Sequence, residues 1–174
     1  MSIRSAVGAA IAVGLTSAVV AASASAAPMV KVRDACDPAT FDAVLGEGAC
    51  VDGGNVTFDS FIDRLLRTGD HPLWRFTPGR ATVPAGQSIE VSNVGGEFHT
   101  FSRTMGFGGG FVEEINELLG LEEIADGCTQ PPGATNLFLG AGESGTVSTA
   151  ALGSGTHRFL CCIHPWMRAT YRVQ

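Results

Sequence analysis

A short segment near the end of the chain combines three side chains that bind soft metal ions. Cys161, His164 and Met167 follow one another with two residues between each pair. A thiolate, an imidazole and a thioether form a soft ligand set that suits copper, whereas zinc sites are built from cysteine, histidine and carboxylate ligands. A second imidazole would complete a plane of two histidines and one cysteine with a weak axial methionine, and His99 is the candidate. We therefore predict one copper ion per chain, held by His99, Cys161, His164 and Met167.

Residues 73–174 are predicted to fold as short β-strands that would position these side chains. Ser88 to Ser92 alternates polar and apolar residues, which is the period-two pattern of a half-buried strand. Turns rich in glycine and proline separate about eight such runs, a number typical of a β-sandwich. The runs lie at 74–76, 82–86, 88–92, 98–103, 136–139, 145–149, 156–161 and 169–173.

An amphipathic helix is predicted in the N-terminal part of the chain. Five apolar residues recur there at the spacing of one helical face: Phe58, Phe61, Ile62, Leu65 and Leu66. Thr57 is a suitable N-cap for this helix. Such a stripe more often packs on its own domain than binds a partner. We therefore expect an N-terminal helical extension over 27–72 that packs on a domain over 73–174.

A second, shorter helix is predicted inside the strand region. It follows three glycines at 108–110, and residues 112–119 carry apolar side chains on one face and glutamates on the other. Gly120 is suited to end it. The glycines lack the lysine and hydroxyl residue of a phosphate-binding loop, so we interpret them as a flexible loop that leads into a short helical insertion.

The strands and ligands together resemble the cupredoxin family, and its amicyanin and plastocyanin branches most closely, over about residues 74–174. The strand from Gly155 to Cys161 is similar to the family pattern G-x-Y-x-F-x-C, with His157 in the place of the tyrosine. Val83 to Gly86 is similar to the V-x-x-G turn that precedes the first histidine of the family. The resemblance implies an all-β Greek-key β-sandwich of about eight strands with a type 1 copper at one end.

The same resemblance implies a function and a partner. It implies a copper-binding, one-electron transfer protein that is not an enzyme. A redox partner protein is expected to dock on a hydrophobic patch near His164 and Trp166. The alternative is an exported copper-binding protein for copper delivery or storage. Copper oxidases and nitrite reductases need several more histidines. Outside the proposed ligands only His71, expected to be solvated in a turn, and His157, expected to face inward, remain.

The five cysteines fit an exported protein with one thiol kept for the metal. With Cys161 assigned to copper, four cysteines remain, and these allow three pairings. We expect Cys36 to pair with Cys50 and Cys128 with Cys162. Because adjacent strand residues point to opposite faces, Cys162 is expected to point away from the metal.

The first 26 residues are predicted to be a signal peptide. Arg4 provides a positive start, an apolar run covers 6–20, and Ala24-Ser25-Ala26 is a suitable cleavage site. The run is short for a membrane span, so no integral span is expected in the mature chain. We predict a periplasmic or secreted protein. The formal net charge of −6 argues against a nucleic-acid partner, which would need a basic face.

Overall fold

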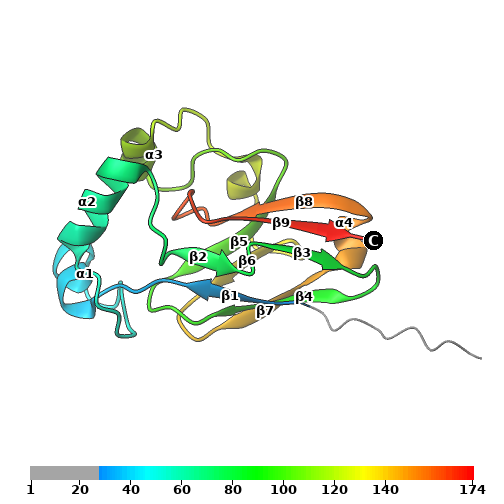
Figure 1. Cartoon of the computed structure of the whole chain (residues 1–174), viewed down its shortest axis with the longest axis horizontal. Coiled ribbons are helices and arrows are strands. Elements are labelled where there is room, and N and C mark those ends of the chain that lie inside the picture. Colours follow the sequence, from blue (N-terminus) through cyan, green and yellow to red (C-terminus); the bar gives the residue numbers. More distant parts are fainter. Residues whose placement is uncertain (1–27) are drawn as a thin grey trace, which may run out of the picture.

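The computed structural model describes residues 28–174, in which two β-sheets lie against each other and three of the helices lie at one end (Figure 1). The predicted signal peptide lies outside the described residues. The strands are β1 (Met29–Arg33), β2 (Arg75–Thr77), β3 (Arg80–Val83), β4 (Ser88–Asn93), β5 (His99–Thr104), β6 (Asn136–Leu139), β7 (Ser144–Ser148), β8 (Gly155–Leu160) and β9 (Arg168–Val173). The helices are α1 (Pro38–Leu45), α2 (Phe58–Thr68), α3 (Glu113–Leu119), α4 (Thr149–Leu152) and the 3-10 helix η1 (Asp126–Thr129). Within residues 28–174, no helix is long and apolar enough to cross a membrane.

The two sheets confirm the predicted β-sandwich. One has the strand order β2-β1-β4-β7 and the other β3-β9-β8-β5-β6. The β1–β4 and β3–β9 pairs are parallel, and the other neighbours are antiparallel. Nine strands are described, where the sequence predicts about eight. The strand that was not predicted is β1, where Val30 and Val32 point into the core. The predicted boundary between an extension over 27–72 and a domain over 73–174 stays a prediction. The first strand of that extension, β1, is nevertheless part of a sheet of the sandwich, because it pairs with β2 and β4.

The space between the sheets is filled by aromatic side chains. Phe101 of β5 stacks on Phe159 of β8 with ring centres 4.3 Å apart, and Phe76 meets Phe101 edge-on at 5.1 Å. Tyr171 of β9 lies against both stacked rings. His157 is buried as predicted, with Nε2 3.0 Å from the Gly153 carbonyl oxygen. Because β5, β8 and β9 share this core, their ends near the proposed metal site are held firmly relative to one another.

The extension forms a helical lobe, α1 and α2, at one end of the sandwich (Figure 1). The predicted cap of α2 is confirmed, because the Thr57 hydroxyl accepts the Ser60 N–H at 3.3 Å. Phe61 and Leu65 are buried on the predicted face, but Leu66 is 66% exposed. Eight residues turn a helix about 80° past two full turns, which carries Leu66 away from the face that Phe58 begins.

An aromatic cluster joins this lobe to the sandwich. Trp74 lies 4.8 Å from Phe61 and 6.0 Å from Phe41, measured between ring centres. Phe61 in turn lies 5.7 Å from Trp166, in the loop between β8 and β9. The expectation that His71 is solvated is wrong: its ring packs edge-on against Trp74 at 4.5 Å, and burial lowers its pKa. The lobe therefore packs directly against the predicted metal loop.

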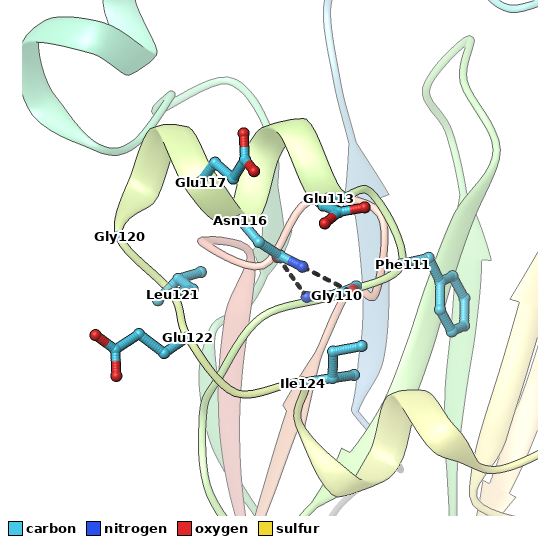
Figure 2. A pocket seen from close by; sticks show the side chains of 9 residues that line it. All are labelled: Gly110, Phe111, Glu113, Asn116, Glu117, Gly120, Leu121, Glu122 and Ile124. Carbon is cyan, nitrogen blue, oxygen red and sulfur yellow. Dashed lines mark hydrogen bonds between the residues drawn. The ribbon is translucent and has the colours of Figure 1, made fainter.

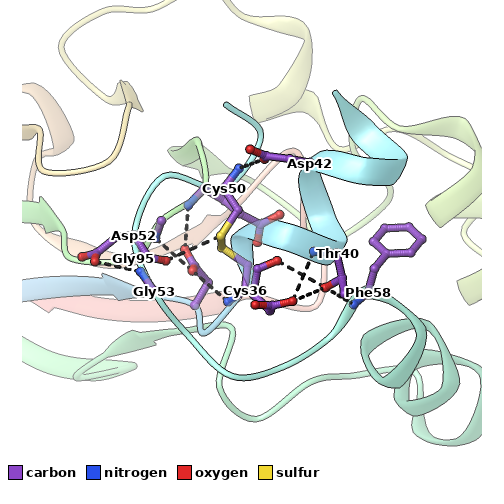
Figure 3. The surroundings of a disulfide bond; sticks show 12 residues. Cys36, Thr40, Asp42, Cys50, Asp52, Gly53, Phe58 and Gly95 are labelled. Carbon is purple, nitrogen blue, oxygen red and sulfur yellow. Dashed lines mark hydrogen bonds between the residues drawn. A yellow bond between two sulfur atoms is a disulfide. The ribbon is translucent and has the colours of Figure 1, made fainter. Parts of the chain in front are cut away.

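The Cys36–Cys50 disulfide is present as predicted and closes the loop around α1 (Figure 3). Asp42 supports the same loop, because its carboxylate accepts the N–H groups of Cys50 at 3.0 Å and Gly48 at 3.1 Å. Figure 3 also shows Gly95 beside this disulfide, on the segment that leads to β5.

Replacing Cys36 and Cys50 together by alanine is expected to lower the free energy of unfolding by about 3 kcal/mol. In the chain-entropy model, a crosslink that closes about 15 residues removes this much freedom from the unfolded chain. Denaturant unfolding of the metal-free protein measures the change, with the exposed neighbour Val51→Ala as the control. An unchanged unfolding midpoint in the double variant would show that the lobe does not unfold together with the sandwich.

The insertion is also anchored as predicted, by a disulfide between Cys128 of η1 and Cys162. The expectation of a flexible glycine loop is wrong, because these glycines make close contacts. The Phe111 N–H donates to the Cys162 carbonyl oxygen at 2.6 Å, and a Cβ on Gly110 would lie 2.0 Å from that oxygen. The Asn116 side chain accepts from the Gly110 N–H and donates to its carbonyl oxygen (Figure 2). The glycines thus allow the insertion to approach the backbone beside Cys161.

Candidate metal centre

Neighbouring strands bring the predicted ligands to one end of the sandwich. His99 is the first residue of β5, and Cys161 follows the last residue of β8. The two strands pair antiparallel, so the start of β5 lies beside the end of β8. His164 and Met167 lie in the short loop between Cys161 and β9.

Three of the four predicted ligands meet in a buried cluster. The Cys161 sulfur lies 3.6 Å from Nδ1 of His99 and 3.6 Å from Nδ1 of His164. The two Nδ1 atoms are 3.2 Å apart. Cys161 and His99 are fully buried, and His164 is 3% exposed. The disulfides leave Cys161 as the free cysteine.

Met167 is held next to this cluster by the backbone of its loop. Its N–H donates to the His164 carbonyl oxygen at 2.8 Å, and its own carbonyl oxygen accepts the Cys161 N–H at 3.1 Å. The side chain is 1% exposed. These bonds close a tight turn that keeps Cys161, His164 and Met167 close together in space as well as in sequence. The axial role of Met167 stays a prediction.

Two carboxylates that the sequence analysis missed lie behind the histidines. Asp34, just after β1, has Oδ2 2.8 Å from Nε2 of His99. Glu97 has Oε2 3.7 Å from Nε2 of His164 and also accepts the Trp74 indole N–H. Glu97 lies only two residues before the candidate ligand His99, and this closeness in sequence could have identified it as part of the site. Nothing in the sequence around Asp34 connects it with a site more than 60 residues away.

The electrostatics of the cluster favour a thiolate. Burial alone would raise the pKa of Cys161, but hydrogen bonds and positive charge from His164 and His99 lower it well below its usual value. Burial opposes charge on His164, yet the negative charges of Glu97 and Cys161 raise its pKa to about 10. The pKa of His99 is raised in the same way against burial, by Asp34 and Cys161. Asp34 is buried too, but its bonds to His99 and to the Gly96 N–H lower its pKa.

The donor atoms fit a soft cation. Nε2 of His99 lies within hydrogen-bond distance of Asp34, and Nε2 of His164 lies 3.7 Å from the Glu97 carboxylate. A negative charge beside each Nε2 favours a proton there, which leaves the two Nδ1 lone pairs pointing toward the thiolate. Converging lone pairs and a thiolate in a buried space need a positive ion between them, either a proton or a metal. Two imidazoles and a thiolate are the ligands of a blue-copper plane.

The cysteine sulfur also receives a backbone hydrogen bond. The Thr100 N–H donates to the Cys161 sulfur at 3.4 Å. The Thr100 hydroxyl in turn accepts the Cys162 N–H at 2.7 Å. Hydrogen bonds to the thiolate are one means by which a protein tunes a copper site, and here β5 supplies one.

The structure was compared with known proteins. No family model and no curated protein matches the sequence. A plastocyanin of fern is similar in structure with a TM-score of 0.42 and 17% identity, over 84% of this chain and 99% of its own. A purple cupredoxin from Nitrosopumilus maritimus gives 0.39 and 10%, over 84% and 99%. Amicyanin from Paracoccus versutus gives 0.37 and 16%, over 57% and 73%.

Because these TM-scores are below 0.5, the assignment rests on what this chain itself contains. It has two packed sheets of four and five strands, and the cysteine and histidine of one inter-strand loop meet an upstream histidine at the start of a neighbouring strand. This is the arrangement that the sequence resemblance implies. The chain has a cupredoxin-like fold.

The loop between β8 and β9 of this cupredoxin-like fold is less exposed than the predicted docking patch near His164 and Trp166 would require. His164 is almost fully buried, while Trp166 is half-buried and contacts both His164, at 5.2 Å between ring centres, and Phe61 of the lobe. The helical lobe therefore covers part of the end where the docking patch was predicted. Of these two residues, Trp166 is the one that reaches the solvent.

A hollow on the insertion lies apart from the cluster. Its lining comes from α3 and its flanks, and none of the predicted ligands belongs to it (Figure 2). Glu113, Glu117 and Glu122 surround it, and Phe111 and Ile124 provide its exposed apolar surface. Its relation to the metal centre is structural, through the Phe111 contact with the backbone of Cys162.

Proposed function

We propose that this cupredoxin-like chain is an exported one-electron carrier with a single type 1 copper held by His99, Cys161, His164 and Met167. The observation that carries the proposal is the convergence of the Cys161 sulfur and two Nδ1 atoms in a buried cluster that favours the thiolate. Bound copper would supply a couple between Cu(I) and Cu(II) at this point.

The protein's own contribution is a site that changes little during electron exchange. Cys161 and Met167 are tied to each other through the loop backbone, and His99 is fixed at the start of β5 by Asp34. Burial keeps water from the cluster. A preorganised, dry set of ligands that suits both oxidation states limits rearrangement when the electron arrives or leaves.

Burial of the cluster also favours an electron carrier over a copper delivery or storage protein. Release of metal to an acceptor protein requires that the acceptor's ligands reach the ion, and here Cys161, His99 and His164 are closed off from solvent. An electron needs no such access. We therefore propose that a redox partner docks at the surface near His164 and Trp166, with the half-buried Trp166 as the contact that reaches the solvent.

Export is supported by the two disulfides, since such bonds persist in oxidising compartments. The predicted signal peptide would direct the chain there. The periplasm of a bacterium or the extracellular space is the expected location.

The proposal is tested with the mature protein loaded with one equivalent of Cu(II). Expected are an intense blue or green absorption, narrow copper hyperfine splitting in the EPR spectrum, and a reversible one-electron wave in voltammetry. A colourless copper complex, or one that is reduced irreversibly with loss of metal, would contradict the electron-carrier function. Rapid transfer of Cu(I) to a chelator of moderate affinity would favour the delivery function instead.

A further inference from the structure

We propose that Asp34 and Glu97 are positioning residues that hold both imidazoles of the metal centre and bias its copper toward the oxidised state. The inference deepens the proposed function and rests on it. Neither residue is a proposed ligand: each acts through the Nε2 atom of a histidine whose Nδ1 faces the Cys161 sulfur.

Asp34 is fixed in place by more contacts than the histidine alone. Its two oxygens accept the N–H groups of Gly96 at 3.0 Å and Glu97 at 3.1 Å, in addition to facing His99. Its side chain is 1% exposed. A Cβ on Gly95 would lie 1.9 Å from Asp34 Oδ2, so the chain passes this carboxylate at a distance that only glycine permits. The orientation of His99 is therefore set by a rigid carboxylate.

Glu97 plays the matching part for His164. Its Oε2 atom accepts the Trp74 indole N–H and lies 3.7 Å from Nε2 of His164, with the side chain 8% exposed. At this distance the contact with the imidazole is mainly one between charges. The Trp74 indole holds the Glu97 carboxylate in a buried environment, where the low dielectric constant strengthens the interaction of its charge with neighbouring groups.

Two consequences follow for a bound ion. Asp34 accepts the Nε2 proton of His99, and the negative charge of Glu97 favours a proton on Nε2 of His164, so each Nδ1 is left free to bind the metal. Two negative charges beside the ligands also stabilise the more highly charged Cu(II) more than Cu(I), because the interaction grows with the charge of the ion. The centre should therefore hold its electron less tightly than the same ligands without these carboxylates.

The origin of Asp34 gives the N-terminal segment a role in this chemistry. Asp34 follows β1 and lies two residues before Cys36, whose disulfide closes the helical lobe. The segment before residue 73 thus supplies a charged group to the metal centre, besides covering it.

The amide variants Asp34→Asn and Glu97→Gln test the inference because they keep shape and an acceptor oxygen but remove the charge. In the copper-loaded protein, each is expected to shift the equilibrium between Cu(II) and Cu(I) at least tenfold toward Cu(I), a rise of about 59 mV for one electron. The intense colour should persist. Asp52→Asn is the matched control: it lies in the same part of the chain, but its carboxylate bonds the Gly53 N–H, and the expected shift is below about twofold. Spectroelectrochemical titration measures all three.

A measurement on the unaltered protein covers the case in which a variant does not fold. In the Cu(I)-loaded form, nitrogen-15 NMR of the histidine rings should show a proton on Nε2 of both His99 and His164. Metal bound through Nε2 of either ring would overturn the inference. So would a Cu(II)/Cu(I) equilibrium constant within twofold of wild type in both amide variants. Either result leaves an intensely coloured, reversible protein, whereas failure of the proposed function would appear as a wild-type protein without colour or reversibility.

Discussion

Replacing Cys161 by serine is expected to abolish the intense colour of the copper-loaded protein and to lower its copper affinity by more than about 100-fold. Loss of a residue that hydrogen-bonds to a metal ligand typically lowers metal affinity 10-fold to 100-fold, and loss of the ligand itself should lower it more. Cys161 supplies the thiolate to which the colour is assigned, and a serine hydroxyl is a hard, neutral donor that suits copper poorly. Absorption spectra and competition with a copper chelator measure both effects.

A matched pair of histidine variants controls this experiment. His99→Gln removes a proposed ligand, whereas His157→Gln alters a buried histidine that bonds a backbone carbonyl oxygen away from the cluster. The first should lose the spectrum of the copper site, and the second should keep it. If Cys161→Ser retains the intense band, the thiolate is not the ligand and the proposed electron carrier is wrong.

Replacing Trp74 by alanine is expected to lower the free energy of unfolding by about 3–5 kcal/mol, the usual cost of truncating a buried aromatic residue. Trp74 is 1% exposed, and its ring packs against Phe41, Phe61 and His71. Its removal would leave a cavity where the helical lobe meets the sandwich, and it would leave the buried Glu97 without its indole partner. Denaturant unfolding of the metal-free protein measures the loss.

Leu66→Ala is the control for this prediction, because Leu66 lies on the same lobe but is exposed, and a change below about 0.5 kcal/mol is expected. Trp74→Phe separates packing from hydrogen bonding: it keeps most of the apolar volume but loses the N–H that reaches Glu97. Equal stabilities of the Trp74→Ala and Leu66→Ala variants would mean that the lobe is not part of the cooperative unit.

The sequence by itself was enough to predict a candidate metal site and the general class of fold. Cys161, His164 and Met167 are close in the chain, and a short loop between two strands cannot separate them far, so their spacing alone predicts a common site. Alternating strands and glycine-rich turns predict the sandwich, because the period of two is a local property of the backbone. Assigning one cysteine to the metal left three possible disulfide pairings, and the structure contains the expected one, Cys36–Cys50 with Cys128–Cys162.

The tertiary structure alone decided what surrounds the ligands. β1 pairs in parallel with β4, a contact between segments about 60 residues apart, and this register brings Asp34 to His99. Local patterns carry no information about such a pairing. Burial of His71 and His164 likewise depends on how the lobe folds back on the metal loop through Trp74 and Phe61. Three of the four candidate ligands are thus neighbours in sequence, whereas the approach of His99 and the charge and burial of the site come from long-range packing.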